Sequence, residues 1–214
     1  WGVDFTRFDQ ITNTYLVKAA LTSQISQEQQ LKVGAEMQWP EVTFGTPTHL
    51  VYTGLDVERH DNEPLNGYPA IQQYYPLAGA AFAQDQLEWR DLTLRVGARL
   101  DYFDARASLP SDPANPANAL GDSVPQSHPE PTTPKVSVSP RLGVAFPITV
   151  RSGLHFAYGH FYQLPPLGDM FANADYSILS RLQAGTSAFS TVMGNPDVKP
   201  EMTVQYEFGY KQSL

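Results

Sequence analysis

Apolar and polar residues alternate one by one along several stretches of this chain. The clearest stretch is residues 92–103, where one row is Leu, Val, Ala and Tyr and the other, as far as residue 101, is Thr, Arg, Gly and Asp. A period of two indicates β-strands, because successive side chains of a strand point to opposite faces. Each strand therefore presents one apolar face and one polar or small face.

The pattern predicts seven strands, at residues 14–25, 31–39, 77–88, 92–103, 139–146, 154–162 and 202–210. We expect Pro40 to end the second strand, because proline cannot donate a hydrogen bond to a ladder. Residues 147–151 are expected to form a turn, and residues 42–57 to pair locally.

The connections between these strands alternate between tight links and long segments rich in Gly, Pro, Asn and Asp. The long segments are residues 40–75, 105–135 and 164–200. We expect residues 105–135 to be mobile, because this composition buries too little apolar surface. Outer-membrane barrels have short periplasmic turns and long extracellular loops, whereas loops in soluble sandwiches are seldom this long. The asymmetry predicts an all-β, antiparallel transmembrane β-barrel, with the three long segments extracellular.

Composition excludes several classes of function. The formal net charge is −8, and the 14 basic residues are scattered singly, which argues against nucleic acid as a partner. The absence of Cys excludes disulfides and thiolate chemistry. No run of about eighteen apolar residues is present, so a membrane would have to be crossed by strands. No leader opens the sequence, and we expect the signal of an exported protein to have been removed.

The sequence carries no recognisable catalytic motif. Ser, His and Asp occur outside any nucleophile elbow, and no Gly-rich phosphate loop is present, so we expect neither enzymatic activity nor a cofactor. His155 and His160 fall on opposite faces of one strand and cannot share a metal. One group of oxygen donors suits calcium but lacks EF-hand spacing, which favours a solvated acidic loop: Asp56, Asp61, Asn62 and Glu63.

Charged residues on the polar faces of the strands are candidates to line a lumen. They are Arg95, Arg99, Asp101, Arg141, His155, Glu207 and Lys211. The favoured interpretation is a ladder of charges between strands and a plug. The alternative is direct contact with a solute.

Four segments resemble TonB-dependent receptors, in the subgroup whose plug follows a carboxypeptidase-regulatory-like domain. They are residues 18–39, 80–104, 139–166 and 194–212. The last is the most specific, with Gly-Asn-Pro-Asp at residues 194–197 and Lys-Pro-Glu at residues 199–201.

This resemblance implies a barrel of about twenty-two strands that encloses a plug. Seven strands would leave two bare edges, which a bilayer does not tolerate. We therefore expect residues 1–214 to be one part of such a barrel, without a plug domain and ending at a periplasmic turn.

The function implied by the resemblance is import of a scarce or bulky solute across the bacterial outer membrane, energised by TonB. A siderophore, a cobalamin or an oligosaccharide would be the cargo. The implied partners are outer-membrane lipid, the remaining barrel strands, the TonB complex through the plug or N-terminal region, and a surface lipoprotein.

Aromatic residues in the long loops are candidates for contact with the cargo, and loop-on-loop packing is the competing interpretation. They are Tyr68, Tyr74, Tyr75, Phe171 and Tyr176. Two other readings of the whole chain remain open: a surface-assembly scaffold and a soluble, glycan-binding β-sandwich.

Overall fold

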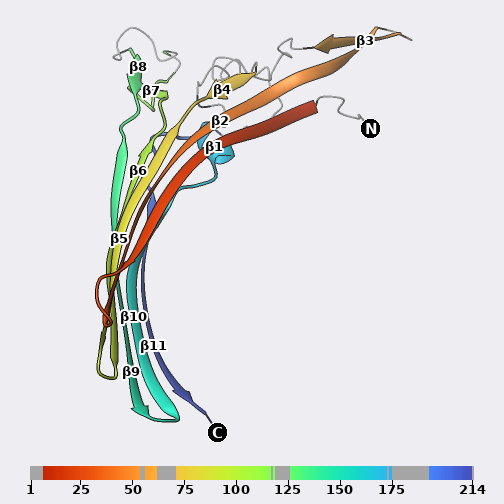
Figure 1. The fold of residues 1–214 in the computed structure, drawn as a ribbon. Coiled ribbons are helices and arrows are strands. Elements are labelled where there is room, and N and C mark those ends of the chain that lie inside the picture. The colour runs from red at the N-terminus through yellow and green to blue at the C-terminus, as the bar shows by residue number, and fades with distance from the viewer. Residues whose placement is uncertain are drawn as a thin grey trace.

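The computed structural model describes residues 7–53, 56–61, 71–116, 118, 126–172, 174 and 193–213. The main strands form one curved antiparallel sheet in the order β1-β2-β5-β6-β9-β10-β11 (Figure 1). Their bounds are Arg7–Gln24 (β1), Gln29–Thr53 (β2), Leu77–Trp89 (β5), Leu92–Asp104 (β6), Lys135–Thr149 (β9), Ser152–Gln163 (β10) and Glu201–Gln212 (β11). This confirms the all-β prediction, and the described strands form an open sheet.

The smaller elements lie at the end of the sheet opposite the tight turns (Figure 1). They are β3 (Asp56–Asp61), β4 (Gln72–Tyr74), β7 (Ser108–Pro110), β8 (Pro129–Pro131) and helix α1 (Leu167–Phe171). β3 and β4 pair with β2, and β7 pairs with β8. Local pairing within residues 42–57 is thus confirmed. The described part of residues 105–135, a segment expected to be a mobile loop, contains the antiparallel pair β7–β8.

The prediction that Pro40 ends a strand is wrong. β2 continues through it to Thr53, and Pro40 pairs with Thr14 of β1. On the other side of β2, the ladder with β5 ends at Gln38 and the ladder with β4 begins at Val42. Pro40 falls in the gap between these two ladders, where its missing N–H breaks no pairing.

The expected turn at residues 147–151 is shorter in the structure. β9 runs to Thr149, leaving only residues 150 and 151 as the turn. Pro147 pairs with Gly153, at the point where the β9–β10 register shifts. Such an irregularity in the ladder is where a strand accommodates proline.

The apolar rows of the strands are exposed to an unusual degree. Val96 and Leu100 on β6 are 47% and 46% exposed, and Tyr206 on β11 is 77% exposed. An apolar face of this size needs a nonpolar environment, which the hydrocarbon of a bilayer supplies to barrel strands. Among the described residues, no helix is both long and apolar enough to span a membrane.

The separation of tight turns from long loops makes a prediction about orientation. The chain has no native Cys, so single cysteines can be introduced at Gln27, in the β1–β2 turn, and at Asn118, beyond β7. In intact cells, a membrane-impermeant maleimide is expected to label Asn118→Cys but not Gln27→Cys, because only the long loops face outward. Both variants should react after the cells are lysed. Labelling of Gln27→Cys alone would reverse the orientation.

Candidate functional site

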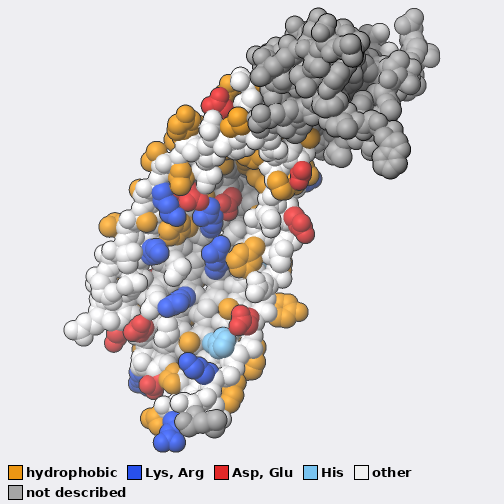
Figure 2. Space-filling model, turned by 90° about the vertical axis from the view of Figure 1, so that its right-hand side faces the viewer, with side chains coloured by type: hydrophobic (Ala, Val, Ile, Leu, Met, Phe, Trp, Pro, Cys, Tyr) orange, Lys and Arg blue, Asp and Glu red, His pale blue; other side chains and the backbone are white. Residues whose placement is uncertain are grey.

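Polar residues of neighbouring strands line up in rows across the concave face of the sheet. One row joins Lys32, Gln84, Gly97 and Arg141 through the β2–β5, β5–β6 and β6–β9 ladders. Figure 2 shows Lys and Arg side chains down the middle of this face. The opposite row of β6, β9, β10 and β11 contains no Lys or Arg. The polar residues singled out from the sequence therefore share the concave face: Arg95, Arg99, Asp101, Arg141, His155, Glu207 and Lys211.

An ionic network joins β1, β2 and β6 on this face. Glu36 accepts a hydrogen bond from Arg99 Nη2 at 2.6 Å, and Lys18 Nζ lies 3.5 Å from its other oxygen. Arg99 Nε donates to Asp101 Oδ1 at 2.7 Å. In register, Ala80 of β5 stands between Glu36 and Asp101. Its small side chain leaves Arg99 free to reach across β5 to Glu36.

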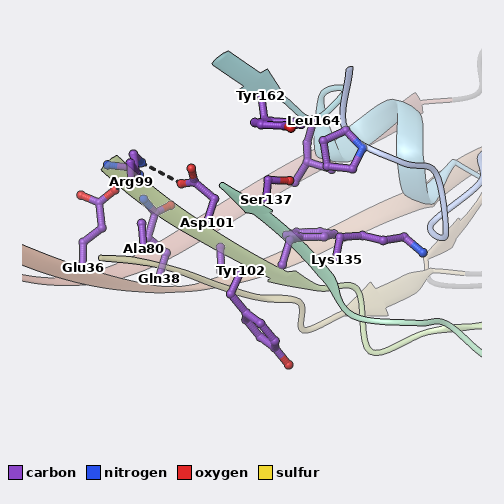
Figure 3. A pocket seen from close by; sticks show the side chains of 14 residues that line it. Glu36, Gln38, Ala80, Arg99, Asp101, Tyr102, Lys135, Ser137, Tyr162 and Leu164 are labelled. Carbon is purple, nitrogen blue, oxygen red and sulfur yellow. Dashed lines mark hydrogen bonds and ion pairs between the residues drawn. The ribbon is translucent and has the colours of Figure 1, made fainter. Parts of the chain in front are cut away.

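The network borders a cavity of about 190 Å³ toward the loop end of the sheet. Figure 3 shows Glu36, Arg99 and Asp101 grouped together, whereas the Tyr102 side chain points away from them. Gln38 of β2, Lys135 and Ser137 of β9 and Tyr162 of β10 add further polar groups to the lining. The cavity thus offers charges of both signs and neutral hydrogen-bonding groups. Glu36 was missed as a site residue, although its place in the polar row of residues 31–39 was the available signal.

Two glycines on the concave face are covered by rings from the neighbouring strand. A Cβ on Gly34 would lie 2.6 Å from Phe82 Cε1, and one on Gly209 would overlap the imidazole of His155. His155 Nε2 also lies 3.3 Å from Glu207 Oε1. A ring placed over a strand glycine supplies the packing that glycine lacks.

A hydrophobic cluster lies at the loop end of the sheet. In it, α1 packs against strands that are distant from it in the sequence. Its buried members lie on β2, at the end of β6 and just after it, and on α1: Val42, Phe103, Ala105, Met170 and Phe171. Tyr74 of β4 stacks on Phe171, with ring centroids 4.6 Å apart and planes at 25°. Because α1 follows β10, its segment spans the concave side of several strands to reach β2 and β4.

The loop aromatics expected to contact cargo fall into different settings. Phe171 is fully buried in the cluster with Tyr74, as in the alternative of loop-on-loop packing. Tyr75 is 51% exposed, and its hydroxyl donates to Gln73 Oε1 at 3.1 Å. Tyr68 and Tyr176 lie outside the described residues. α1 itself was not predicted, although Leu167, Met170 and Phe171 have the i, i+3, i+4 spacing of a helix.

The Gly-Asn-Pro-Asp sequence ties the start of β11 to the start of β9. Asp197 Oδ1 accepts hydrogen bonds from Thr133 N at 2.7 Å, Thr133 Oγ1 at 3.0 Å and Lys135 Nζ at 2.8 Å. Burial alone would raise the pKa of Asp197, but the bonds from Lys135 and Thr133 outweigh it and hold that pKa below its ordinary value. The Asp197 N–H donates to Asn195 Oδ1, which closes the turn.

Gly194 brings the same turn against α1. Its N–H donates to the Ala172 carbonyl at 2.6 Å, and a Cβ at Gly194 would overlap the carbonyl oxygen of Met170. Only glycine permits this close approach of two backbones. The Gly-Asn-Pro-Asp sequence belongs to the segment with the most specific resemblance to the family. In the structure it fixes both the entry into β11 and the position of α1.

Within the part of the chain that the structure describes, no three His, Asp or Glu side chains converge on a potential metal position. Of the four candidate calcium donors, Asn62 and Glu63 lie outside that part. The side chains of Asp56 and Asp61 are also outside it.

Comparison with known proteins identifies the family of the chain. The model of the family described as "TonB dependent receptor-like, beta-barrel" matches residues 2–214. A search of curated proteins finds no match. The soluble β-sandwich reading is wrong, since the main strands form a single curved sheet and the matching family is one of outer-membrane barrels. The chain belongs to the β-barrel family of TonB-dependent receptors, which are bacterial outer-membrane transporters and receptors, not enzymes.

Proposed function

We propose that the protein containing this barrel imports a scarce or bulky solute of the siderophore, cobalamin or oligosaccharide class. The family match over residues 2–214 carries this proposal, because it assigns TonB-dependent transport in the outer membrane to the fold. The cavity beside Glu36, Arg99 and Asp101 supports the cargo class. Its mixed lining suits a solute with many hydrogen-bonding groups, a property that the three classes share.

The open edges of the sheet support a larger assembly. Among the described strands, β1 and β11 each have a neighbour on one side only. A bilayer does not tolerate such edges, so we assign them to pairing with further strands of a complete barrel around a plug. A carboxypeptidase-regulatory-like domain before the plug, outward-facing long loops and a surface lipoprotein belong to the same proposal.

Energy for the import would come through TonB, because the outer membrane has no nucleotide supply. In this mechanism TonB pulls on the plug, and the barrel wall provides the path that the solute follows. The concave face contributes hydrogen-bonding side chains along that path, and the segment around α1 narrows it at the loop end.

Uptake measurements test this proposal. Cells that carry the whole gene should accumulate one of the candidate cargos and grow on it, and deletion of TonB should reduce uptake to the level of cells without the gene. A small solute that enters through open porins serves as the control and should be unaffected. Cargo uptake that persists undiminished without TonB would instead indicate a passive pore, and absence of uptake of any candidate would favour a surface-assembly scaffold.

A further inference from the structure

Three hollows follow one another along the concave face of the sheet. The first is the cavity of about 190 Å³ beside Glu36, Arg99 and Asp101. The second, of about 230 Å³, shares Arg99 with the first. The third, of about 360 Å³, shares Gly97 and Arg141 with the second. We call them the series of hollows.

One strand lines the whole series. Asp101, Arg99, Gly97 and Arg95 are alternate residues of β6, and they border the hollows in that order from the loop end toward the tight turns. Asp101 and Arg95 are six residues apart, which is about 20 Å along a strand. Pockets for a whole small molecule hold about 300 to 1,000 Å³, so each hollow is below this range or near its lower end. A solute that occupies all three must therefore be linear.

The first hollow offers hydrogen-bonding groups whose charges are already compensated. Its charged side chains are Glu36, Arg99, Asp101 and Lys135. Arg99 bonds to both Glu36 and Asp101, and Lys135 bonds to Asp197. A hydroxyl group both donates and accepts, so it can bond to either member of such a pair. This lining favours a solute that is rich in hydroxyl groups.

The second and third hollows are basic. Lys32 and Arg141 border the second, and Arg95 and Arg141 border the third. Among the described side chains, none of these three cations makes an ion pair with a carboxylate. The third hollow also contains Glu207, which lies 3.3 Å from His155. The excess of cations favours anionic groups on the solute.

Each hollow is also bordered by an aromatic residue. These are Tyr162 at the first, Phe82 at the second and Phe161 at the third. In Figure 3, Tyr162 and Asp101 approach the first hollow from different strands. Phe161 is 40% exposed on the polar face, and its ring centroid lies 5.1 Å from the Arg141 guanidinium. Exposed aromatic surface on a polar wall indicates a binding partner, and the apolar face of a sugar ring can pack against it.

We propose that the series of hollows is the path of a linear acidic oligosaccharide, a chain of sugar rings that carry carboxylate groups. This inference rests on the proposed function and selects one of its three cargo classes. The length of the series accounts for a linear cargo, the first hollow for hydroxyl groups, the cations for carboxylates and the aromatic residues for rings. A compact iron chelate or cobalamin would occupy one hollow at a time.

An acidic peptide is the other linear anion of this length. Peptides that bind a sheet commonly add a strand to a free edge. The hollows lie on β2, β5, β6 and β9, and each of these strands has a neighbour on both sides. The wall beside the hollows therefore offers a peptide no free strand edge, which favours the sugar.

TonB-dependent uptake by cells that carry the whole gene tests the length and the charge of the cargo. The probes are labelled linear oligomers of galacturonate and of mannuronate, long enough to span about 20 Å. At least one of them should be taken up and should lose uptake when TonB is removed. Three competitors should act about tenfold more weakly than the unlabelled acidic chain: the single uronate, a neutral malto-oligosaccharide of equal length and an acidic peptide.

Phe161 provides the variant that separates contact with the solute from a structural role. Phe161→Ala should raise the probe concentration for half-maximal uptake about tenfold without lowering the maximal rate. Phe161→Tyr keeps the ring and should retain uptake. Phe156→Ala is the matched control, because it is the same truncation on the same strand but in the apolar row, where Phe156 pairs with Val144. Heat-modifiable gel mobility verifies that each barrel is folded.

Preference for the long acidic chain, weakened by Phe161→Ala and not by Phe156→Ala, supports the inference. TonB-dependent uptake of an iron chelate or a cobalamin in its place would overturn the inference and leave the proposed function intact. Preference for the neutral chain or the peptide would also overturn it, as would equal effects of the two Ala variants. Failure of the proposed function looks different, because wild-type uptake would then persist after TonB is removed.

Discussion

Replacing Val96 with arginine is expected to lower the free energy of unfolding of the barrel in a bilayer by about 2 to 4 kcal/mol. Val96 lies in the middle of β6 on the apolar row and is 47% exposed. An arginine there would place a charge in the hydrocarbon, away from the polar row that holds Arg95 and Arg99. Urea titration of the complete barrel folded into lipid vesicles measures the loss.

Ala157 of β10 provides the matched control for this variant. It lies on the concave face and pairs with Glu207 of β11, so Ala157→Arg keeps its charge in a polar setting and should cost less than about 1 kcal/mol. Gly97, next to Val96, is unsuitable because a Cβ there would lie 2.9 Å from the Ala83 carbonyl oxygen. Equal losses at Val96 and Ala157 would contradict the assignment of the two faces.

The second prediction concerns the turn that leads into β11. Asp197→Asn is expected to destabilise this turn by about 1.5 to 3 kcal/mol at neutral pH, because a charge-assisted hydrogen bond from Lys135 is lost. Hydrogen exchange at residues 194–200 reports local opening and should accelerate. Asp112→Asn is the control, since Asp112 Oδ1 accepts a hydrogen bond from the Ala114 N–H and makes no ion pair among the described residues.

The pH dependence of this effect follows from the direction of the pKa. The folded-state pKa of Asp197 lies below its ordinary value. Its contribution is therefore complete above the unfolded-state pKa, about 4, and is lost as the pH falls through the folded-state pKa. Wild type and Asp197→Asn should differ at pH 7 and converge under strong acid. A difference that stays constant down to the lowest pH would show that the carboxylate charge is not what holds the turn.

The strands and their two faces could be predicted from the sequence, because alternation is a local property. In residues 92–102 every apolar residue occupies the same row, and no knowledge of the neighbouring strands was needed. The same holds for the polar-face assignment of Arg95, Arg99 and Asp101. The lengths of the connections between strands can also be read directly from the sequence. Their alternation predicted a barrel with its tight turns at one end.

Whether a proline ends a strand was decided by tertiary structure. Pro40 continues β2 because the ladders of β5 and β4 leave a gap beside it. Pro147 remains in β9 because the register shifts opposite it. Neither neighbour could be inferred from the residues that flank these prolines.

Which residues meet in the candidate site could likewise be known only from the tertiary structure. Glu36 and Arg99 are far apart in sequence, and they meet only because β5 places the small Ala80 between their strands. Phe171 is buried only because Tyr74 and Val42 come from other parts of the sheet. The sequence alone determined which side chains share a face of the sheet, through the period of each strand. Which of them touch was decided by register and by the path of α1, because both depend on pairing between distant segments.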